Sequence, residues 1–209
     1  MRVEKRKEGQ LFRQFDYLDI VDSTNDYLKA FVGDGEPLMV VAREQTAGKG
    51  RCDRKWYSPP EEGLYVSYLL YPGWRVEHSP FLNMLSGLAV VRTIREESIS
   101  DLQLKLKRPN DILLEGKKVG GILTETSSLH DHILWAIVGI GVNLYQRDFP
   151  KDLCQKATSL SLEGVTVGHR LDFCDSLTRQ FERLYRQLEM GAWEVVQAEF
   201  EEQLTALDS

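Results

Sequence analysis

Cysteine is scarce in this chain: its 209 residues include only Cys52, Cys154 and Cys174. The number is odd, and no two of them stand at the spacing of a paired metal-binding motif, which argues against a disulfide framework and a cysteine-based zinc site. We therefore expect reduced thiols and a cytoplasmic location. His130 and His132 flank Asp131, but a polar turn is the expected role of these residues, and we expect no bound metal among them.

Long apolar stretches and linker-like segments are also missing. The first eight residues carry charges of both signs and lack the apolar core of a signal peptide. The longest apolar run, residues 133–144, is too short for a transmembrane helix and contains two glycines. No stretch is rich in proline, serine or glycine, no internal repeat occurs, and 42% of the residues are hydrophobic. We expect one domain over residues 1–209, with one core and no membrane partner.

An excess of positive charge is absent, because the net charge is −6 and acidic residues gather at positions 194–202. A DNA-binding domain needs a basic face and a helix-turn-helix, and the sequence leaves no room for that motif before Phe15. We therefore expect no nucleic-acid partner.

Strands and helices are expected to interleave irregularly. Apolar and β-branched runs predict strands at residues 16–20, 38–45, 63–71, 104–107, 119–125 and 133–144. Helices are predicted after a cap at Ser23 or Thr24 and over residues 80–97, 171–190 and 192–207. The core positions of the second helix are Leu82, Leu85, Leu88, Ala89, Val91 and Ile94. This order favours an α+β fold with a mixed β-sheet flanked by helices.

A basic glycine loop directly follows the strand at residues 38–45. Residues 45–56 contain two glycines, which let the backbone pass close to a ligand, and the cations Lys49, Arg51, Arg54 and Lys55. Such charges meet a carboxylate or a phosphate, so an anionic small molecule is the expected ligand. A solvated basic turn is the alternative.

A second cationic motif lies at residues 107–112 and 117–125. Asn110 and Asp111 follow a proline and suit a turn between short strands, and Asp111 offers a carboxylate to magnesium, a ribose hydroxyl or an attacking amine. Lys118 opens a strand in which Gly120 and Gly121 indicate that a backbone or a ligand packs flat against it. A hairpin with a bulge at the two glycines is the alternative.

Asn143 stands at the end of the apolar run at residues 133–144, which is typical of a central buried strand. From this place its amide either contacts a nucleotide or caps a turn.

These segments, in this order, resemble the biotin protein ligases, the family that attaches biotin to a lysine of biotin-dependent carboxylases. The family's glycine- and arginine-rich loop is matched by Gly48, Gly50, Arg51, Arg54 and Trp56. Its Lys-Trp-Pro-Asn-Asp element is matched by Lys107, Pro109, Asn110 and Asp111. Residues 22–25, 118–123, 125 and 139–143 agree as well, with a weaker echo at 157–160, so the resemblance covers residues 15–188.

The resemblance implies a fold of the biotin/lipoate protein ligase catalytic-domain type and a two-step reaction. Biotin and ATP, with Mg²⁺, give biotinyl-5′-AMP and pyrophosphate, and biotin then passes to a lysine of a biotin carboxyl carrier protein. Arg51 and Lys118 would hold the carboxylate and the α-phosphate, Lys107 would assist, and Asp111 would orient or deprotonate the lysine amine.

The resemblance also implies two sets of ligand contacts, and it leaves a homodimer open. Those for biotin are Ser23, Thr24, Asn25, Gln45, Gly48, Lys49, Gly50, Arg51, Trp56, Lys118, Gly120 and Gly121. Those for ATP are Arg51, Arg54, Trp56, Asn110, Asp111, Lys118 and Asn143. Simpler structural roles are the alternatives for several of these residues: a helix cap for Ser23 and Thr24, a core aromatic for Trp56 and a turn residue for Asn143.

The chain departs from the family pattern at three positions. Lys49 replaces an arginine, Asp53 replaces a glycine and Arg108 replaces a tryptophan. Asp53 places an anion in the basic loop and is expected either to pair with neighbouring cations or to be a solvated turn residue. We also expect neither the amino-terminal DNA-binding domain nor the carboxyl-terminal β-barrel of other members. The alternative functions are a non-catalytic biotin or biotinyl-adenylate binding protein and a lipoate or octanoyl transferase.

Overall fold

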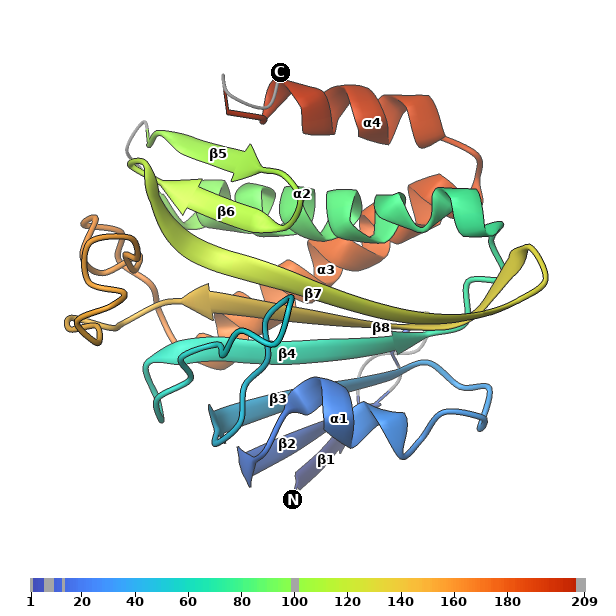
Figure 1. Ribbon diagram of the computed structural model, residues 1–209, viewed down its shortest axis with the longest axis horizontal. Helices are drawn as coiled ribbons and strands as arrows, with labels where there is room; N and C mark the ends of the chain where they lie inside the picture. Colours follow the sequence, from blue (N-terminus) through green and yellow to red (C-terminus); the bar gives the residue numbers. More distant parts are fainter. Residues whose placement is uncertain (1, 6–9, 13, 99–101, 206–209) are drawn as a thin grey trace. The chain divides into compact units, whose positions relative to one another are not determined.

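The computed structural model describes residues 2–5, 10–12, 14–98 and 102–205 (Figure 1). Its strands are β1 (Arg2–Lys5), β2 (Gln14–Val21), β3 (Leu38–Gln45), β4 (Gly63–Leu70), β5 (Leu104–Lys107), β6 (Asp111–Leu114), β7 (Lys117–Leu129) and β8 (His132–Asn143). Its helices are α1 (Thr24–Lys29), the short 3-10 helix η1 (Val76–His78), α2 (Pro80–Glu97), α3 (Arg170–Glu189) and α4 (Trp193–Glu202).

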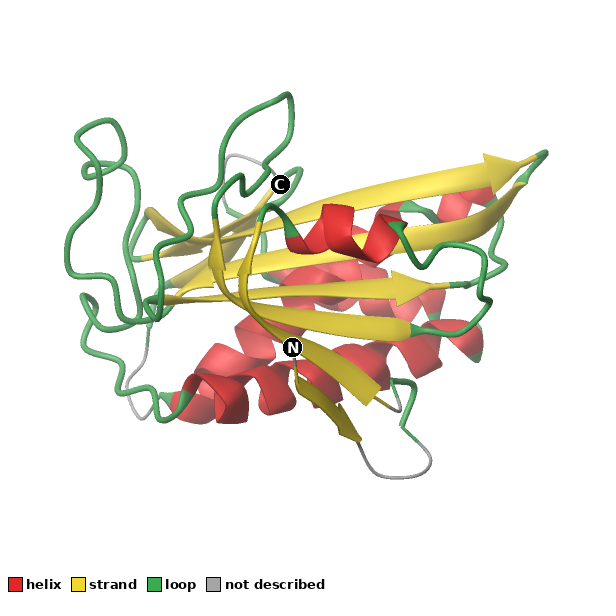
Figure 2. Ribbon diagram, turned by 90° about the horizontal axis from the view of Figure 1, so that it is seen from below, coloured by secondary structure: helices red, strands yellow, loops and turns green. Residues whose placement is uncertain are grey.

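The strands form a mixed eight-stranded sheet in the order β1-β2-β3-β4-β8-β7-β6-β5. Strands β2 and β3 are parallel, whereas β3 and β4, β5 and β6, and β6 and β7 are antiparallel. The predicted α+β class with a mixed sheet is confirmed. Figure 2 shows that the chain consists of both strands and helices.

The predicted boundaries were wrong in several places. Strands β1 and β6 were not predicted, and Asp111 begins β6 instead of lying in a turn. Strand β7 continues past the predicted end at residue 125 to Leu129, because residues 126–129 pair within the long β7–β8 hairpin. Helix α4 ends at Glu202, before the predicted residue 207, because the chain then pairs with Leu106.

The chain divides into two compact units. The first contains residues 1–82 and 122–141, and the second contains residues 83–121 and 142–209. The expectation of one domain over residues 1–209 stays a prediction.

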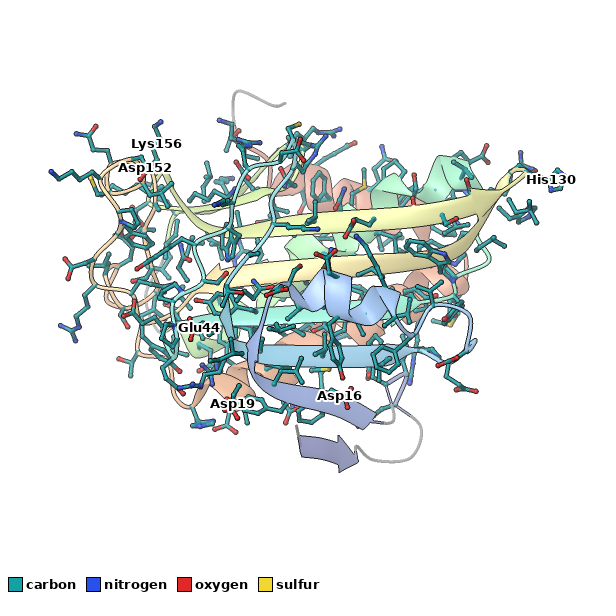
Figure 3. All side chains as sticks on the ribbon, turned by 60° about the horizontal axis from the view of Figure 1, so that its bottom comes forward. Asp16, Asp19, Glu44, His130, Asp152 and Lys156 are labelled. Carbon is teal, nitrogen blue, oxygen red and sulfur yellow. The ribbon has the colours of Figure 1, made fainter. Side chains whose placement is uncertain are left out.

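The first unit is built around β2, β3 and β4, with α1 contacting β3 and β4. One core cluster of buried residues consists of Leu18, Leu28, Leu38, Val40, Ala42, Leu69 and Ile137. Ser23 caps α1, because its hydroxyl accepts a hydrogen bond from the backbone N–H of Asp26. The halves of β7 and β8 in this unit run in opposite directions as a hairpin with His130 at its tip (Figures 1 and 3).

The second unit holds most of α2, all of α3 and α4, and the β5–β6 hairpin. The predicted core residues of α2 are all buried. Helix α4 is fixed to α2 by Arg92, whose guanidinium donates to both carboxylate oxygens of Glu199 at 2.9 and 2.6 Å. The chain after α4 pairs with β5. The backbone N–H of Leu106 donates to the carbonyl of Gln203, and the carbonyl of Leu106 accepts from the N–H of Thr205.

Candidate active site

The basic loop is a tight hairpin. The N–H of Gly50 donates to the carbonyl of Arg54 at 2.6 Å, and the N–H of Trp56 donates to the carbonyl of Gly48 at 2.9 Å. A Cβ at Gly48 would lie 2.7 Å from the carbonyl oxygen of Trp56, so only glycine lets the two arms approach this closely. The loop is therefore a formed structural element between β3 and β4.

The tip of this hairpin uses left-handed backbone. Cys52 and Asp53 have φ angles of 54° and 57°, a region that glycine enters freely and aspartate tolerates. The glycine that the biotin protein ligase pattern places at position 53 fits this geometry. The carboxylate of Asp53 forms no ion pair with another described residue, so the expected pairing with loop cations is not found.

The cations of the hairpin differ in their partners. Lys49 Nζ lies 2.6 Å from Asp26 Oδ2, on α1. Arg51, Arg54 and Lys55 are exposed, and their side chains form no ion pair within the described part of the chain. These three positive charges are therefore available to an anion.

A polar network lies at the base of the hairpin. The N–H and the hydroxyl of Thr24 both donate to Gln45 Oε1, at 2.9 and 3.0 Å. This fixes the orientation of the amide, because a backbone N–H is only a donor. Gln45 Nε2 then donates one proton to Ser58 Oγ at 2.9 Å, and its second proton has no partner among the described residues. The hydroxyl oxygen of Ser67, which is fully buried, lies 2.7 Å from Thr24 Oγ1.

Asn25 is tied into the protein at both ends of its amide. Its Nδ2 donates to Glu125 Oε2 at 2.9 Å and to the carbonyl of Leu123 at 3.3 Å, and its Oδ1 accepts from Ser67 at 2.7 Å. These bonds orient the start of α1. Biotin contacts of Ser23, Thr24 and Asn25 stay predictions, and the capping role of Ser23 is confirmed.

Two glycines of β8 make room for site residues. A Cβ at Gly141 would lie 2.5 Å from Cε2 and Nε1 of Trp56, and a Cβ at Gly139 would overlap Oδ1 of Asn25. Trp56 therefore packs closely against Gly141 of β8. Its role at a bound adenylate stays a prediction.

The second cationic motif forms a row across the sheet of the second unit. Lys107 on β5 is paired with Asp111 on β6, and Asp111 is paired with Gly121 on β7. Lys118 Nζ lies 2.6 Å from Asp111 Oδ1, and both side chains are about 70% buried, with 30% and 28% exposed. The predicted cation and the predicted base thus form an ion pair.

The backbone of Lys118 forms hydrogen bonds with residues outside the β6–β7 hairpin. Its N–H donates to the carbonyl of Lys156 at 2.8 Å, and its carbonyl accepts from the N–H of Thr158 at 2.9 Å. The β6–β7 register shifts between Ile112 and Leu113, which leaves Val119 as the bulged residue next to Gly120. A bulge therefore occurs, one residue before the glycines. Ligand contacts of Gly120 and Gly121 stay predictions.

Asn143 has a structural role at the end of β8. Its Nδ2 donates to the carbonyl of Thr158 at 2.8 Å, its Oδ1 accepts from Gln146 at 3.2 Å, and its side chain is 4% exposed. The amide joins two loop segments of the second unit. Contacts of Asn143 and Asn110 with ATP stay predictions.

No group of three His, Cys, Asp or Glu side chains that suits a metal ion occurs in the described residues. Nδ1 of His132, the first residue of β8, lies 2.8 Å from Oδ1 of Asp131 in the preceding turn. All three cysteines are free thiols, with Cys174 buried. No helix within the described ranges is long and apolar enough to cross a membrane.

Side chains of α1 have shifted pKa values, among them those of Tyr27 and Asp26. Burial raises the pKa of Tyr27 to about 12, and the hydrogen bond from its hydroxyl to Asp16 Oδ2, at 2.9 Å, acts in the same direction. Asp16 lies on β2 and is 5% exposed (Figure 3). For Asp26, burial opposes the shift, but hydrogen bonds from Lys49 and Lys29 outweigh it and lower the pKa.

Solved structures of the same architecture include biotin protein ligases. The chain superposes on the biotin protein ligase of Aquifex aeolicus in complex with biotin and ATP with a TM-score of 0.78, at 30% identity, covering 91% of this chain and 78% of that one. The biotin protein ligase of Leishmania major in complex with biotinyl-5-AMP gives a TM-score of 0.75 at 26% identity, covering 91% of this chain and 81% of that one. The fold is therefore that of biotin protein ligase catalytic domains.

Sequence comparison identifies the family. The model of the biotin/lipoate A/B protein ligase family matches residues 17–143, and the chain belongs to this family. The bifunctional ligase/repressor BirA of Bacillus spizizenii is 37% identical over 174 residues, which are 81% of this chain and 53% of that protein. The biotin–(acetyl-CoA-carboxylase) ligase of Paracoccus denitrificans is 36% identical over 80% of this chain and 71% of its own length. The chain spans about half the length of the BirA relative.

Proposed function

We propose that the chain is an ATP-dependent biotin–protein ligase. The observation that carries the proposal is the hairpin at residues 48–56, which presents three cations that form no ion pair with the described residues. These cations stand over a polar network in which one amide proton of Gln45 has no partner in the same part of the chain. Cations suit a carboxylate and a phosphate, and an oriented amide suits the carbonyl of a ureido ring. The similarity to a ligase in complex with biotin and ATP supports the same substrates here.

In the first step a carboxylate oxygen of biotin attacks the α-phosphorus of ATP. The new O–P bond forms as the bond to the β-phosphate oxygen breaks, and pyrophosphate leaves. Because the two reactants are both anions, Arg51 and Lys118 would offset their repulsion, with Lys107 assisting. Lys49, whose ammonium is paired with Asp26, would also assist. Trp56 and the hairpin would keep water from the acyl-adenylate.

Mg²⁺ would arrive with the triphosphate. The described residues include no group of three His, Cys, Asp or Glu side chains for it, which is compatible with an ion held mainly by phosphate oxygens and water. Asp111 is the one carboxylate of the second motif that we assign to the reaction, and it is paired with Lys118. Bound magnesium would neutralise charge on the phosphates.

In the second step a lysine amine of a biotin carboxyl carrier protein attacks the acyl carbon. The C–N bond forms, the bond to the AMP oxygen breaks, and the amine proton passes to Asp111. The neighbouring Lys118, whose Nζ lies 2.6 Å from Asp111 Oδ1, orients this carboxylate before the amine arrives. The free thiols fit the cytoplasm, where such a carrier would be found.

The test is a single turnover with labelled biotin, ATP and magnesium, followed by addition of a carrier domain. We expect labelled biotinyl-adenylate first and labelled carrier afterwards, with no transfer to a carrier whose acceptor lysine is changed to arginine. Retention of biotin or its adenylate without turnover would support a binding protein instead. Equal use of lipoate would contradict the assignment, because its ring has no acceptor for the amide of Gln45.

A further inference from the structure

Four alternating charges connect the basic hairpin to α1 and β7 within the first unit. Lys49 Nζ lies 2.6 Å from Asp26 Oδ2, and Asp26 Oδ1 lies 2.9 Å from Lys29 Nζ. Lys29 Nζ also lies 2.7 Å from Glu125 Oε1, and Glu125 Oε2 accepts from Asn25 at 2.9 Å. The chain of contacts therefore runs from the hairpin to the same network that holds Thr24 and Gln45.

The two arms of the hairpin are held in different ways. The second arm carries Trp56, which packs against Gly141 of β8. On the first arm, Lys49 is the one loop cation with an ion pair inside the described ranges. Asp26 is thus the partner that connects the first arm to α1, and its carboxylate is shared between two ammonium groups.

We infer that Asp26 is a positioning residue that, through Lys49, holds the first arm of the hairpin against α1 and so slows the opening of the loop. For the consequence on catalysis this inference rests on the proposed function, since a loop that opens more slowly retains a reactive intermediate longer. Lys49 and Asp26 side chains are 46% and 35% exposed, so salt screens the contact and its effect is modest. The lowered pKa of Asp26 agrees with a carboxylate that stays ionised in this position.

Limited trypsin digestion of the ligand-free protein tests the inference without any ligase activity. Arg51, Arg54 and Lys55 provide cleavage sites in the hairpin. We expect Asp26→Asn to raise the rate of cleavage there about two- to fivefold at low salt, the change that loss of one exposed ion pair produces, and Asp26→Glu to restore most of the protection. Lys29→Gln is the matched control, because it removes the other partner of Asp26 and leaves the contact with Lys49 in place.

The wild-type protein supplies a second measurement. Its hairpin should become more sensitive to trypsin as salt rises from about 0.05 M to about 0.5 M, relative to an unstructured peptide of the same sequence, because screening weakens the ion pair. This measurement decides the question if Asp26→Asn fails to fold. Equal cleavage of Asp26→Asn and wild type, an equal effect of Lys29→Gln, or no response to salt would each overturn the inference.

The consequence for catalysis is measured separately. In Asp26→Asn we expect biotinyl-adenylate to leave the protein about two- to fivefold faster, with adenylation at saturating substrates unchanged. Faster cleavage of the hairpin without faster release of biotinyl-adenylate would show that Asp26 restrains the loop only in the ligand-free protein. This result would overturn the link between Asp26 and retention of the intermediate. Absence of adenylate in wild type and variant alike would contradict the proposed function, and the digestion result would still stand.

Discussion

Replacing Gly141 by alanine should displace Trp56 and disturb the basic hairpin. The added Cβ would lie 2.5 Å from Cε2 and Nε1 of Trp56, about 0.9 Å inside the 3.4 Å limit of ordinary contact. An indole ring is rigid, and the N–H of its residue is bonded to Gly48 at 2.9 Å, so relief requires movement of the hairpin arm. Overpacking of this kind costs about 1–3 kcal/mol. For a chain of this size each kcal/mol lowers the melting temperature by about 2–4 °C.

Thermal unfolding of Gly141→Ala and Gly168→Ala, followed by circular dichroism, measures this cost. Gly168 is the matched control, because a Cβ there would have nothing within 4 Å. We expect Gly168→Ala to stay within about 0.5 kcal/mol of wild type and Gly141→Ala to melt clearly lower, with weaker adenylation. Equal melting temperatures for the two variants would refute the packing of Trp56 against β8.

Three further predictions concern single side chains. Arg51→Ala and Lys118→Ala should each slow adenylation about a hundredfold with unchanged circular dichroism, and a variant that keeps half its activity would remove that residue from the catalytic set. Asp53→Gly should change adenylation and intermediate release by less than about twofold, because this exposed carboxylate has no ion pair among the described residues; a larger change would assign it a role. The raised pKa of Tyr27, about 12, means that its protonated hydroxyl stabilises the fold below about pH 10 and loses this effect as the pH rises towards 12. Tyr27→Phe should therefore flatten the loss of thermal stability in this window, and an unchanged slope would contradict the buried hydrogen bond to Asp16.

Much of the fold follows from local sequence pattern, and the failures have tertiary causes. Residues 38–45 and 80–97 were predicted with the observed bounds, because the first segment begins with an uninterrupted apolar run and the second is a long helix with apolar residues at helical spacing. Strand β6 has only four residues, and it exists because β5 and β7 flank it on both sides. The apolar pattern predicted that α4 continues after Glu202, but the backbone of residues 203 and 205 forms hydrogen bonds with Leu106 instead. The local sequence does not indicate this long-range pairing.

The sequence indicated the site residues that lie in clusters of charged residues and glycines, but it did not indicate the serines that orient them. Lys118 and Asp111 stood out in the sequence and do form an ion pair. Ser58 and Ser67 orient Gln45 and Asn25, yet an isolated serine in a strand or loop gives no such indication. The alternate glycines at the end of β8 were a usable signal, since both face the same side of the strand, where side chains of the site lie.

Biotin-dependent exchange of labelled pyrophosphate into ATP tests the central claim most directly, because it requires reversible adenylation and no carrier protein. With purified protein, ATP and magnesium, we predict exchange that appears with biotin, is absent without it and is close to background with lipoate. Folded protein that binds biotin but shows no exchange above the control without biotin would contradict the assignment of this chain as a ligase.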